Sequence, residues 1–343
     1  SNKKYNLDLN LNVQATRSTK VTFGMNGRVQ NSNYPSIAPG RLWELIGYTH
    51  TQNGPLYYSN GVPGTYITSS LLNSGYNKIN TTALFSQLSI DQDLSFIPGL
   101  KAKITVAYDP TIGSNKLWRV PIHKGSIDTS VHPYVISDGI FEQTKASLNQ
   151  SFTQSYQRTY QASLNYARSF GENDISALAL FESKDNGSNN LSASRRNYNL
   201  GIDEINLGSS SNSDMTTGGT SSEGKQMGLV YRVTYAYANK YLLEASGRYD
   251  GSYYFAPATR FGFFPAFSVG WRMSEEKFMK NISWINSLKI RGSYGEVGAL
   301  AGSPFQYLST FSVYGPAYVI GGQAVQGASE RNESNPNITW ERA

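Results

Sequence analysis

Apolar and polar residues alternate with a period of two in repeated stretches of this chain. Residues 5–13 place Tyr, Leu and Val on one side and amide or acidic residues on the other, which is the pattern of a half-buried strand. A short polar turn at 16–19 leads into a second alternating stretch, 21–30, and the two together predict a β-hairpin.

Four further pairs of alternating segments follow the first hairpin. They cover about 82–108, 160–181, 227–248 and 263–294, and residues 337–343 resemble the start of another strand. The apparent strand length of roughly ten to thirteen residues suits a tilted bilayer crossing, which needs about 9–11, whereas strands of soluble proteins usually have about five or six. We therefore expect ten complete strands and the beginning of an eleventh.

The connections between these segments alternate between short turns and long stretches rich in Gly, Ser and Asn. The long ones occupy about 31–80, 110–155, 184–224 and 298–336, and a short connection near 252–260 is the exception. Outer-membrane barrels combine short periplasmic turns with long extracellular loops. The pattern predicts an all-β fold: the wall of a membrane β-barrel, built as an antiparallel up-and-down meander with its long loops outside the cell.

Aromatic residues fall at the predicted strand ends on the apolar face. Two such groups are expected to form girdles at the membrane interfaces. The outer group is Tyr5, Tyr108, Tyr249 and Phe263, and the inner group is Phe170, Tyr237, Tyr241 and Trp271.

Composition agrees with this fold class and excludes several others. Only 16% of the residues are charged, while Gly and Tyr number 32 and 24. A mean hydropathy of −0.42 is typical of soluble proteins, but strands that alternate lipid-facing and lumen-facing residues keep the average low. The net charge of +6 comes from scattered basic residues, which gives no indication of nucleic-acid binding. Because Cys is absent, disulfides and thiolate metal sites are excluded.

Motifs for catalysis or cofactor binding are weak. Residues 219–226 nearly match a phosphate-binding P-loop, but Gln226 replaces the required Ser or Thr and a strand pattern follows instead of a helix. His50, His123 and His132 are expected in loops and lack metal-ligand spacing. The chain contains no Gly-x-Ser-x-Gly elbow. We expect no enzyme activity, no cofactor and no metal.

Two sets of residues are candidates for contact with a solute. The first set is charged and predicted to face the lumen, where pairing across strands is the more ordinary role. The second set consists of aromatic residues predicted in loops, whose flat rings stack on sugars or pack against peptide side chains, with packing inside the loops or against a protein partner as an equal alternative. The lumen-facing set is Arg28, Arg232, Glu244, Arg248, Arg272, Lys289 and Arg291, and the loop aromatics are Trp43, Tyr48, Tyr57, Tyr58, Trp118 and Tyr134.

Three segments in the last third of the chain resemble the barrel signature of SusC/RagA-type TonB-dependent transporters of the Bacteroidetes. They are YLLEASGRYDGSYYFAPATRFGFFPAFSVGWRMSEEKFM at 241–279, SLKIRGSYGEVG at 287–298 and NPNITWE at 335–341. The chain departs from the family pattern at Tyr253 and Tyr254, where a basic residue is common, and at Gly298-Ala299, where Gly-Asn is usual.

The resemblance implies that residues 1–343 are one partial barrel domain of a wall of about 22 strands around a plug. The plug, the TonB-binding box and the C-terminal strands would lie outside this sequence. The family further implies an outer-membrane location in a Gram-negative cell, contact with lipid and lipopolysaccharide, a SusD-like lipoprotein lid, coupling to TonB through the plug, and import of glycan or peptide fragments.

Other functions remain open on the sequence alone. A siderophore or cobalamin receptor would lack the lipoprotein partner, and a passive adhesion barrel would lack the plug and the TonB box. An outer-membrane hydrolase with catalytic groups on its loops is a third alternative. No motif identifies the transported substrate.

Overall fold

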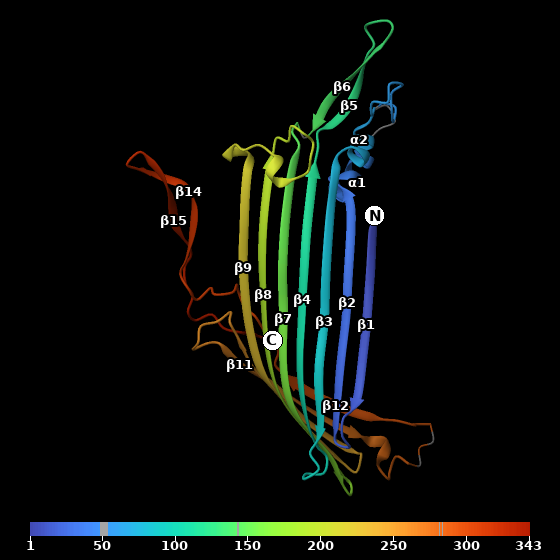
Figure 1. The fold of residues 1–343 in the computed structure, drawn as a ribbon. Coiled ribbons are helices and arrows are strands. Elements are labelled where there is room, and N and C mark those ends of the chain that lie inside the picture. The colour runs from blue at the N-terminus through green and yellow to red at the C-terminus, as the bar shows by residue number, and fades with distance from the viewer. Residues whose placement is uncertain (49–53, 143, 281, 283) are drawn as a thin grey trace.

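The chain forms one curved antiparallel sheet, with smaller elements in the connections between its strands (Figure 1). The computed structural model describes residues 1–48, 54–142, 144–280, 282 and 284–343. The ten sheet strands are β1 (Asn2–Gln14), β2 (Thr19–Pro35), β3 (Gly75–Asp93), β4 (Leu100–Arg119), β7 (Ser147–Phe170), β8 (Asn173–Arg196), β9 (Met215–Tyr237), β10 (Tyr241–Ser252), β11 (Phe261–Arg272) and β12 (Lys289–Gly295).

The remaining elements lie in the connections. Two hairpins, β5–β6 and β14–β15, project from the sheet (Figure 1). None of the helices in the described ranges is long and apolar enough to cross a bilayer. These elements are α1 (Pro39–Tyr48), α2 (Tyr66–Leu72), β5 (Ile122–Asp128), β6 (Val135–Glu142), η2 (Ile205–Leu207), η3 (Asn212–Asp214), η4 (Met273–Glu275), β13 (Gly298–Ala299), β14 (Thr310–Ile320), β15 (Gln323–Asn332) and β16 (Glu341–Arg342).

The sheet confirms the predicted meander. Each of its strands pairs antiparallel with its neighbour in the sheet, in chain order once β5 and β6 are set aside. Of the predicted strand start at 337–343, the structure shows only Glu341–Arg342 (β16) as a strand, paired with β13. The sheet does not close on itself within this chain, as expected for part of a larger wall.

Three of the predicted long loops are shorter than expected because the strands continue into them. Strands β7 and β8 each have 24 residues and β9 has 23, well beyond the predicted ten to thirteen. In these extensions both faces carry mostly Ser, Thr, Asn and Gln, so the alternation of apolar with polar residues that marks a strand in a sequence is lost. Backbone pairing alone reveals them.

The register separates two faces of the sheet. Directly paired residues of an antiparallel sheet point to the same side, so each row of partners can be assigned to one face. One face carries no Lys, Arg, Asp or Glu over a continuous band that crosses all ten strands, and we call it the apolar band. It is formed by every second residue of 5–13, 19–29, 82–92, 100–112, 160–166, 173–183, 227–237, 241–251, 261–271 and 290–294.

Side chains of the apolar band are not covered by the rest of the chain. Leu229, Val233 and Val269 keep 46%, 47% and 58% of their surface exposed. An apolar face of this extent is unfavourable in water and suits a hydrocarbon environment. The predicted inner aromatics meet in one row, since Tyr241 pairs with both Tyr237 and Trp271.

Glycines in the band make room for aromatic rings from the next strand. The Tyr231 ring lies over Gly247 and stacks on Phe263, with 6.1 Å between ring centroids. A Cβ on Gly247 would overlap the Tyr231 hydroxyl and lie 2.7 Å from the Phe264 carbonyl oxygen. A ring packed over a glycine in this way fixes the register of the strands it crosses.

A single carboxylate ties together the inner ends of β10 and β11. Glu276 accepts hydrogen bonds from the Tyr241 hydroxyl (2.8 Å), the Lys240 ammonium (3.0 Å) and the Trp271 indole N–H (3.3 Å). The bonds from Tyr241, Lys240 and Trp271 lower the pKa of Glu276 below its usual value. The interfacial Trp and Tyr rings are therefore anchored by an ionised group just outside the band.

We expect Gly247→Ala to lower the stability of the full-length receptor by about 1–3 kcal/mol, because the new methyl group displaces Tyr231 or the backbone at Phe264. Thermal unfolding in detergent, followed by the gel mobility of heated samples, measures the effect. Gly292→Ala is the matched control, since this glycine also lies on the apolar face but has nothing within 4 Å of its Cβ position. Equal melting temperatures for the two variants would refute the packing argument.

A second prediction concerns pH. Because folding lowers the pKa of Glu276, its stabilising effect is present above the unfolded value of about 4.3 and is lost as the pH falls through the folded value. Glu276→Gln should therefore melt below the wild type at neutral pH, and the gap should close in acid. Glu275→Gln, at the exposed neighbouring position, should leave the melting curve unchanged at either pH. A gap that persists unchanged in acid would contradict the assignment.

Candidate functional site

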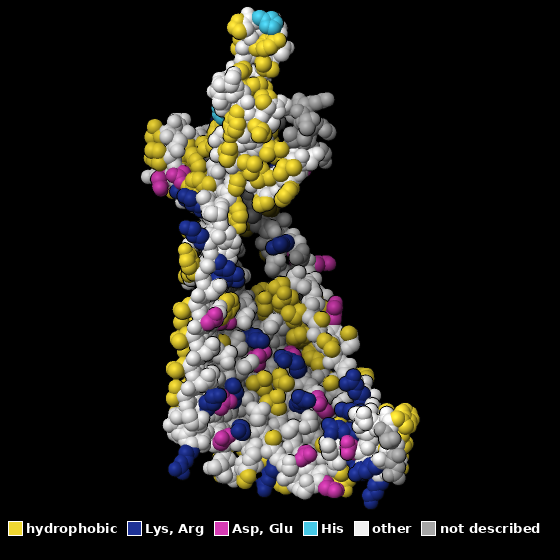
Figure 2. Space-filling model, turned by 90° about the vertical axis from the view of Figure 1, so that its right-hand side faces the viewer, with side chains coloured by type: hydrophobic (Ala, Val, Ile, Leu, Met, Phe, Trp, Pro, Cys, Tyr) yellow, Lys and Arg dark blue, Asp and Glu magenta, His cyan; other side chains and the backbone are white. Residues whose placement is uncertain are grey.

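The face opposite the apolar band carries the charged side chains of the sheet. Figure 2 shows acidic and basic side chains interspersed over the broad lower part of the molecule. The register places all seven predicted charged residues on this polar face: Arg28, Arg232, Glu244, Arg248, Arg272, Lys289 and Arg291.

Some of the charged side chains on the polar face bond to groups on a neighbouring strand or turn. Arg232 on β9 donates to Glu244 on β10 at 2.8 Å, and Arg272 donates to the Asn239 side chain. Pairs this exposed contribute only about 0–1 kcal/mol each, so their main effect is to orient the side chains. By contrast, Lys289 and Arg291 on β12 make no ion pair with any residue in the described part of the chain.

One charge network spans three strands. Arg248 on β10 donates to Asp250 at 2.8 and 3.0 Å, and lies 3.9 Å from Glu182 on β8, which also pairs with Lys184 at 2.9 Å. Gly228 on β9 lies between them, and a Cβ there would overlap the Asp250 carboxylate. The missing side chain at Gly228 is what lets charges on β8 and β10 approach one another.

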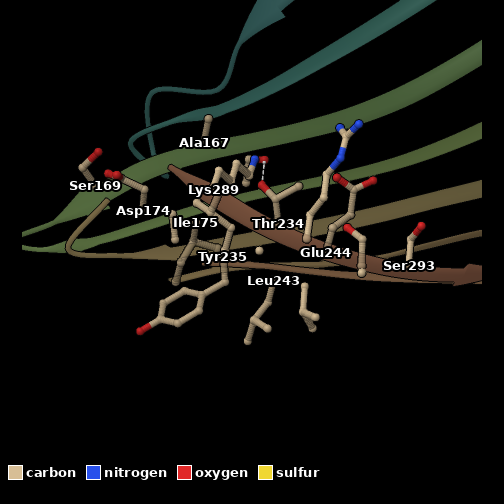
Figure 3. A pocket seen from close by; sticks show the side chains of 18 of the residues that line it. Ala167, Ser169, Asp174, Ile175, Thr234, Tyr235, Leu243, Glu244, Lys289 and Ser293 are labelled. Atoms are coloured by element: carbon tan, nitrogen blue, oxygen red, sulfur yellow. Dashed lines mark hydrogen bonds between the residues drawn. The ribbon is translucent and has the colours of Figure 1, made fainter. Parts of the chain in front are cut away.

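The polar face carries several hollows, of which two lie among the predicted charged residues. The one nearer the short-turn end has a volume of about 910 Å³. Asp174, Glu244 and Lys289 lie on its polar side, whereas Tyr235 and Leu243 point to the opposite face (Figure 3). A 2.5 Å hydrogen bond between the hydroxyls of Ser176 and Thr234 crosses its floor.

The second hollow, of about 560 Å³, has a charged wall and an aromatic wall. The charged wall is the network around Arg248, and the aromatic wall is formed by Phe264 and Trp340. Trp340 donates its indole N–H to the Arg260 carbonyl at 2.9 Å and packs against Phe255 and Phe264, with ring centroids 5.5 and 5.4 Å away. The signature segments 241–279 and 335–341 therefore meet at one aromatic cluster.

The predicted loop aromatics mostly lie at the long-loop end. Trp43 on α1 is 73% exposed, Tyr134 before β6 is 53% exposed and Tyr57 is 45% exposed. Tyr58 is half-buried, with its ring against Gly125 of β5. Tyr48 is the last residue of α1. None of these placements identifies a ligand.

The expectation for Trp118 was wrong. It is not in a loop but in β4, where it is 6% exposed and packs edge-on against Tyr198, at 4.8 Å between ring centroids, and beside Leu148. The connection between β8 and β9 folds back over the outer part of the sheet and covers it. A ring enclosed in this way is not available to a solute.

The histidines and the P-loop-like segment have structural settings. His123 lies in β5 rather than in a loop, and its Nδ1 is 2.9 Å from the Asp138 carboxylate on β6. His132 lies between β5 and β6, and His50 falls outside the described residues. Residues 219–226 belong to β9, which confirms that they do not precede a helix. Within the described ranges, no group of three or more His, Cys, Asp or Glu residues is arranged to hold a metal.

Sequence reasoning missed Glu182, Asp250 and Trp340. The first two share the polar-face parity of Arg248, so alternation alone would have placed them on the same side. Their proximity depends on Gly228, whose importance appears only once the strands are in register. Trp340 belongs to a recognised signature segment, but its contacts lie about 80 residues away in the chain.

Comparison with known proteins gives consistent sequence matches. The chain is 31% identical over 181 residues to TonB-dependent receptor P3 of Formosa agariphila, which covers 52% of this chain and 18% of that protein. It is 22% identical over 332 residues to TonB-dependent receptor SusC of Bacteroides thetaiotaomicron, covering 92% of this chain and 30% of that protein. The chain thus spans less than a third of the length of either relative. No family model matches it.

Solved structures show the same fold. The structure of the RagAB peptide transporter superposes on 99% of this chain and 37% of the matched chain, with a TM-score of 0.78 and 16% sequence identity. The RagAB peptide importer in its closed-closed and open-open states matches equally well. TonB-dependent receptors are outer-membrane barrels. With its open meander and its matches along nearly the whole sequence, the chain is part of the barrel of a SusC/RagA-type TonB-dependent receptor.

Proposed function

We propose that the receptor containing this chain imports glycan or peptide fragments across the outer membrane with energy supplied through TonB. The main observation behind this proposal is that the ten-stranded sheet has one exposed, uncharged face and one charged face. The uncharged face suits hydrocarbon and the charged face suits a water-filled lumen. The paired strands also satisfy every backbone amide inside the bilayer, as a membrane-spanning wall requires. The receptor class is one of transporters and not of enzymes.

The long-loop end would meet the ligand and the partner first. The RagAB assembly is described as a peptide transporter, and SusC is the other named relative. By analogy we assign this receptor a SusD-like lipoprotein partner at the end that carries α1, α2 and the β5–β6 hairpin. Lipid and lipopolysaccharide would cover the apolar band from outside.

Exposed aromatics at this end are the proposed first contacts for the ligand. Trp43, Tyr57 and Tyr134 offer rings that stack on sugar faces or pack on apolar peptide side chains. Further in, charges such as Lys289 and Arg291 would line the path of the solute. Such aromatic and charged contacts suit both glycan and peptide fragments.

Growth of the host tests the function. Cells that carry the full-length receptor should use either oligopeptides or oligosaccharides as sole source of the nutrient, and deletion of the receptor or of TonB should abolish that growth. Free amino acids and monosaccharides serve as controls that bypass the receptor. Unchanged growth on both polymer classes after deletion would rule the proposal out.

The loop aromatics are tested by substitution in the full-length receptor. Trp43→Ala and Tyr134→Ala should each weaken binding of the imported fragment about tenfold, which corresponds to about 1.4 kcal/mol for an aromatic contact. Trp284→Ala is the matched control, because this residue is 81% exposed but lies in the turn between β11 and β12. Wild-type affinity in both loop variants, measured by calorimetry, would remove these residues from the site.

A further inference from the structure

The apolar band ends at basic residues on its long-loop side. Following each strand outward along the same face, the first charged side chain is a cation on β1, β3, β4, β7 and β9, and an acid only on β8. We call this set of cations the outer cation belt: Lys3, Lys78, Lys116, Arg158 and Lys225.

At the centre of the belt three charged residues lie side by side on adjacent strands. The register pairs Arg158 on β7 with Asp185 on β8, and Asp185 with Lys225 on β9. Arg158 is 2.9 Å from the Asp185 carboxylate, and its guanidinium lies over the Tyr156 ring at 4.5 Å. The carboxylate therefore holds Arg158 in place and leaves a net positive charge on the triad.

Arg158, Asp185 and Lys225 border a hollow of about 450 Å³, and Tyr156 and Glu223, which share their outward face, also line it. Tyr156 supplies an aromatic wall on the outward side, where Glu223 is a second acid. The Tyr253 ring, which packs against Phe305, lies over Gly224 on the polar-face side.

Three cations of the belt have no carboxylate partner. Among the residues the structure describes, Lys3, Lys78 and Lys225 form no ion pair, and all three are exposed. Lys78 lies over the Tyr76 ring at 4.2 Å, whereas Lys116 is paired with Asp203 at 2.8 Å. Unpaired cations at the border of an apolar surface are placed to meet anionic headgroups of the lipid that covers that surface.

We propose that the outer cation belt binds phosphate groups of anionic lipid in the outer leaflet, with the hollow beside Arg158 and Lys225 as its principal site. Ammonium and guanidinium groups donate charge-assisted hydrogen bonds to phosphate oxygens, and the Tyr156 ring packs against the adjoining apolar part of the lipid. The inference rests on the membrane location proposed above. It adds a specific lipid contact to a wall that otherwise meets only hydrocarbon.

The test uses the full-length receptor in phosphatidylcholine nanodiscs that contain either diphosphorylated or dephosphorylated lipid A. After extraction in mild detergent, retained lipid A is counted by mass spectrometry. The wild type should retain the phosphorylated form at least tenfold better, and the combined Lys3→Gln, Lys78→Gln and Lys225→Gln variant should lose most of this preference. The matched control replaces three lysines of the opposite face, Lys4, Lys101 and Lys103, by Gln, which changes the net charge equally.

Two further measurements distinguish a lipid site from a site bridged by a divalent cation and from a site for inorganic phosphate. Glu223→Gln should increase retention because it removes a repelling carboxylate, whereas a site bridged by a divalent cation would be weakened by this change. Competition by millimolar inorganic phosphate would show an ion site instead of a lipid site. Retention that is equal in the belt variant and the control, a loss in Glu223→Gln, or full competition by phosphate would each overturn the proposal. Nutrient uptake scored in the same cells reports separately on the proposed function.

Discussion

Backbone hydrogen bonding in hydrocarbon is the constraint on which this structure depends. A strand that crosses a bilayer has no water to satisfy its amides, so each must be paired with a neighbouring strand. Successive side chains of a paired strand point to opposite faces of the sheet. If a strand shifted its register by one residue, its charged side chains would point into the lipid. The uncharged band across ten strands is the result of keeping a single register from Tyr5 to Tyr294.

Glycine has two different uses in this register. On the apolar face, Gly247 accepts the ring of Tyr231, which then stacks on Phe263 one strand further along. On the polar face, Gly228 leaves a gap through which charges of β8 and β10 meet. In both places the absence of a side chain on the middle strand lets residues of the two flanking strands contact each other. Each contact therefore links three strands rather than two.

The alternation of the sequence was sufficient to predict the ten strands of the main sheet, their order and the face of all seven charged candidates, but it gave no sign of the β5–β6 and β14–β15 hairpins. It failed where water bathes both faces, as in the outer parts of β7, β8 and β9, because no apolar side is then needed. It also failed for Trp118, whose burial depends on Tyr198 from a distant connection. The hollow beside Trp340 could not be predicted for the same reason as the burial of Trp118: its walls come from segments about 80 residues apart in the chain. Pattern predicts which side a residue faces, but not what folds over it.

The contact between Arg248 and Glu182 across Gly228 has a mechanical consequence. Sliding β9 by one residue relative to its neighbours would put Met227 or Leu229 in place of Gly228, and a bulky apolar group would then separate Arg248 from Glu182. Slippage thus meets both a steric obstacle and the loss of a charge contact at the same position. A wall built this way resists shear along its strands, which is the property required of a rigid frame when force is applied to something held inside it.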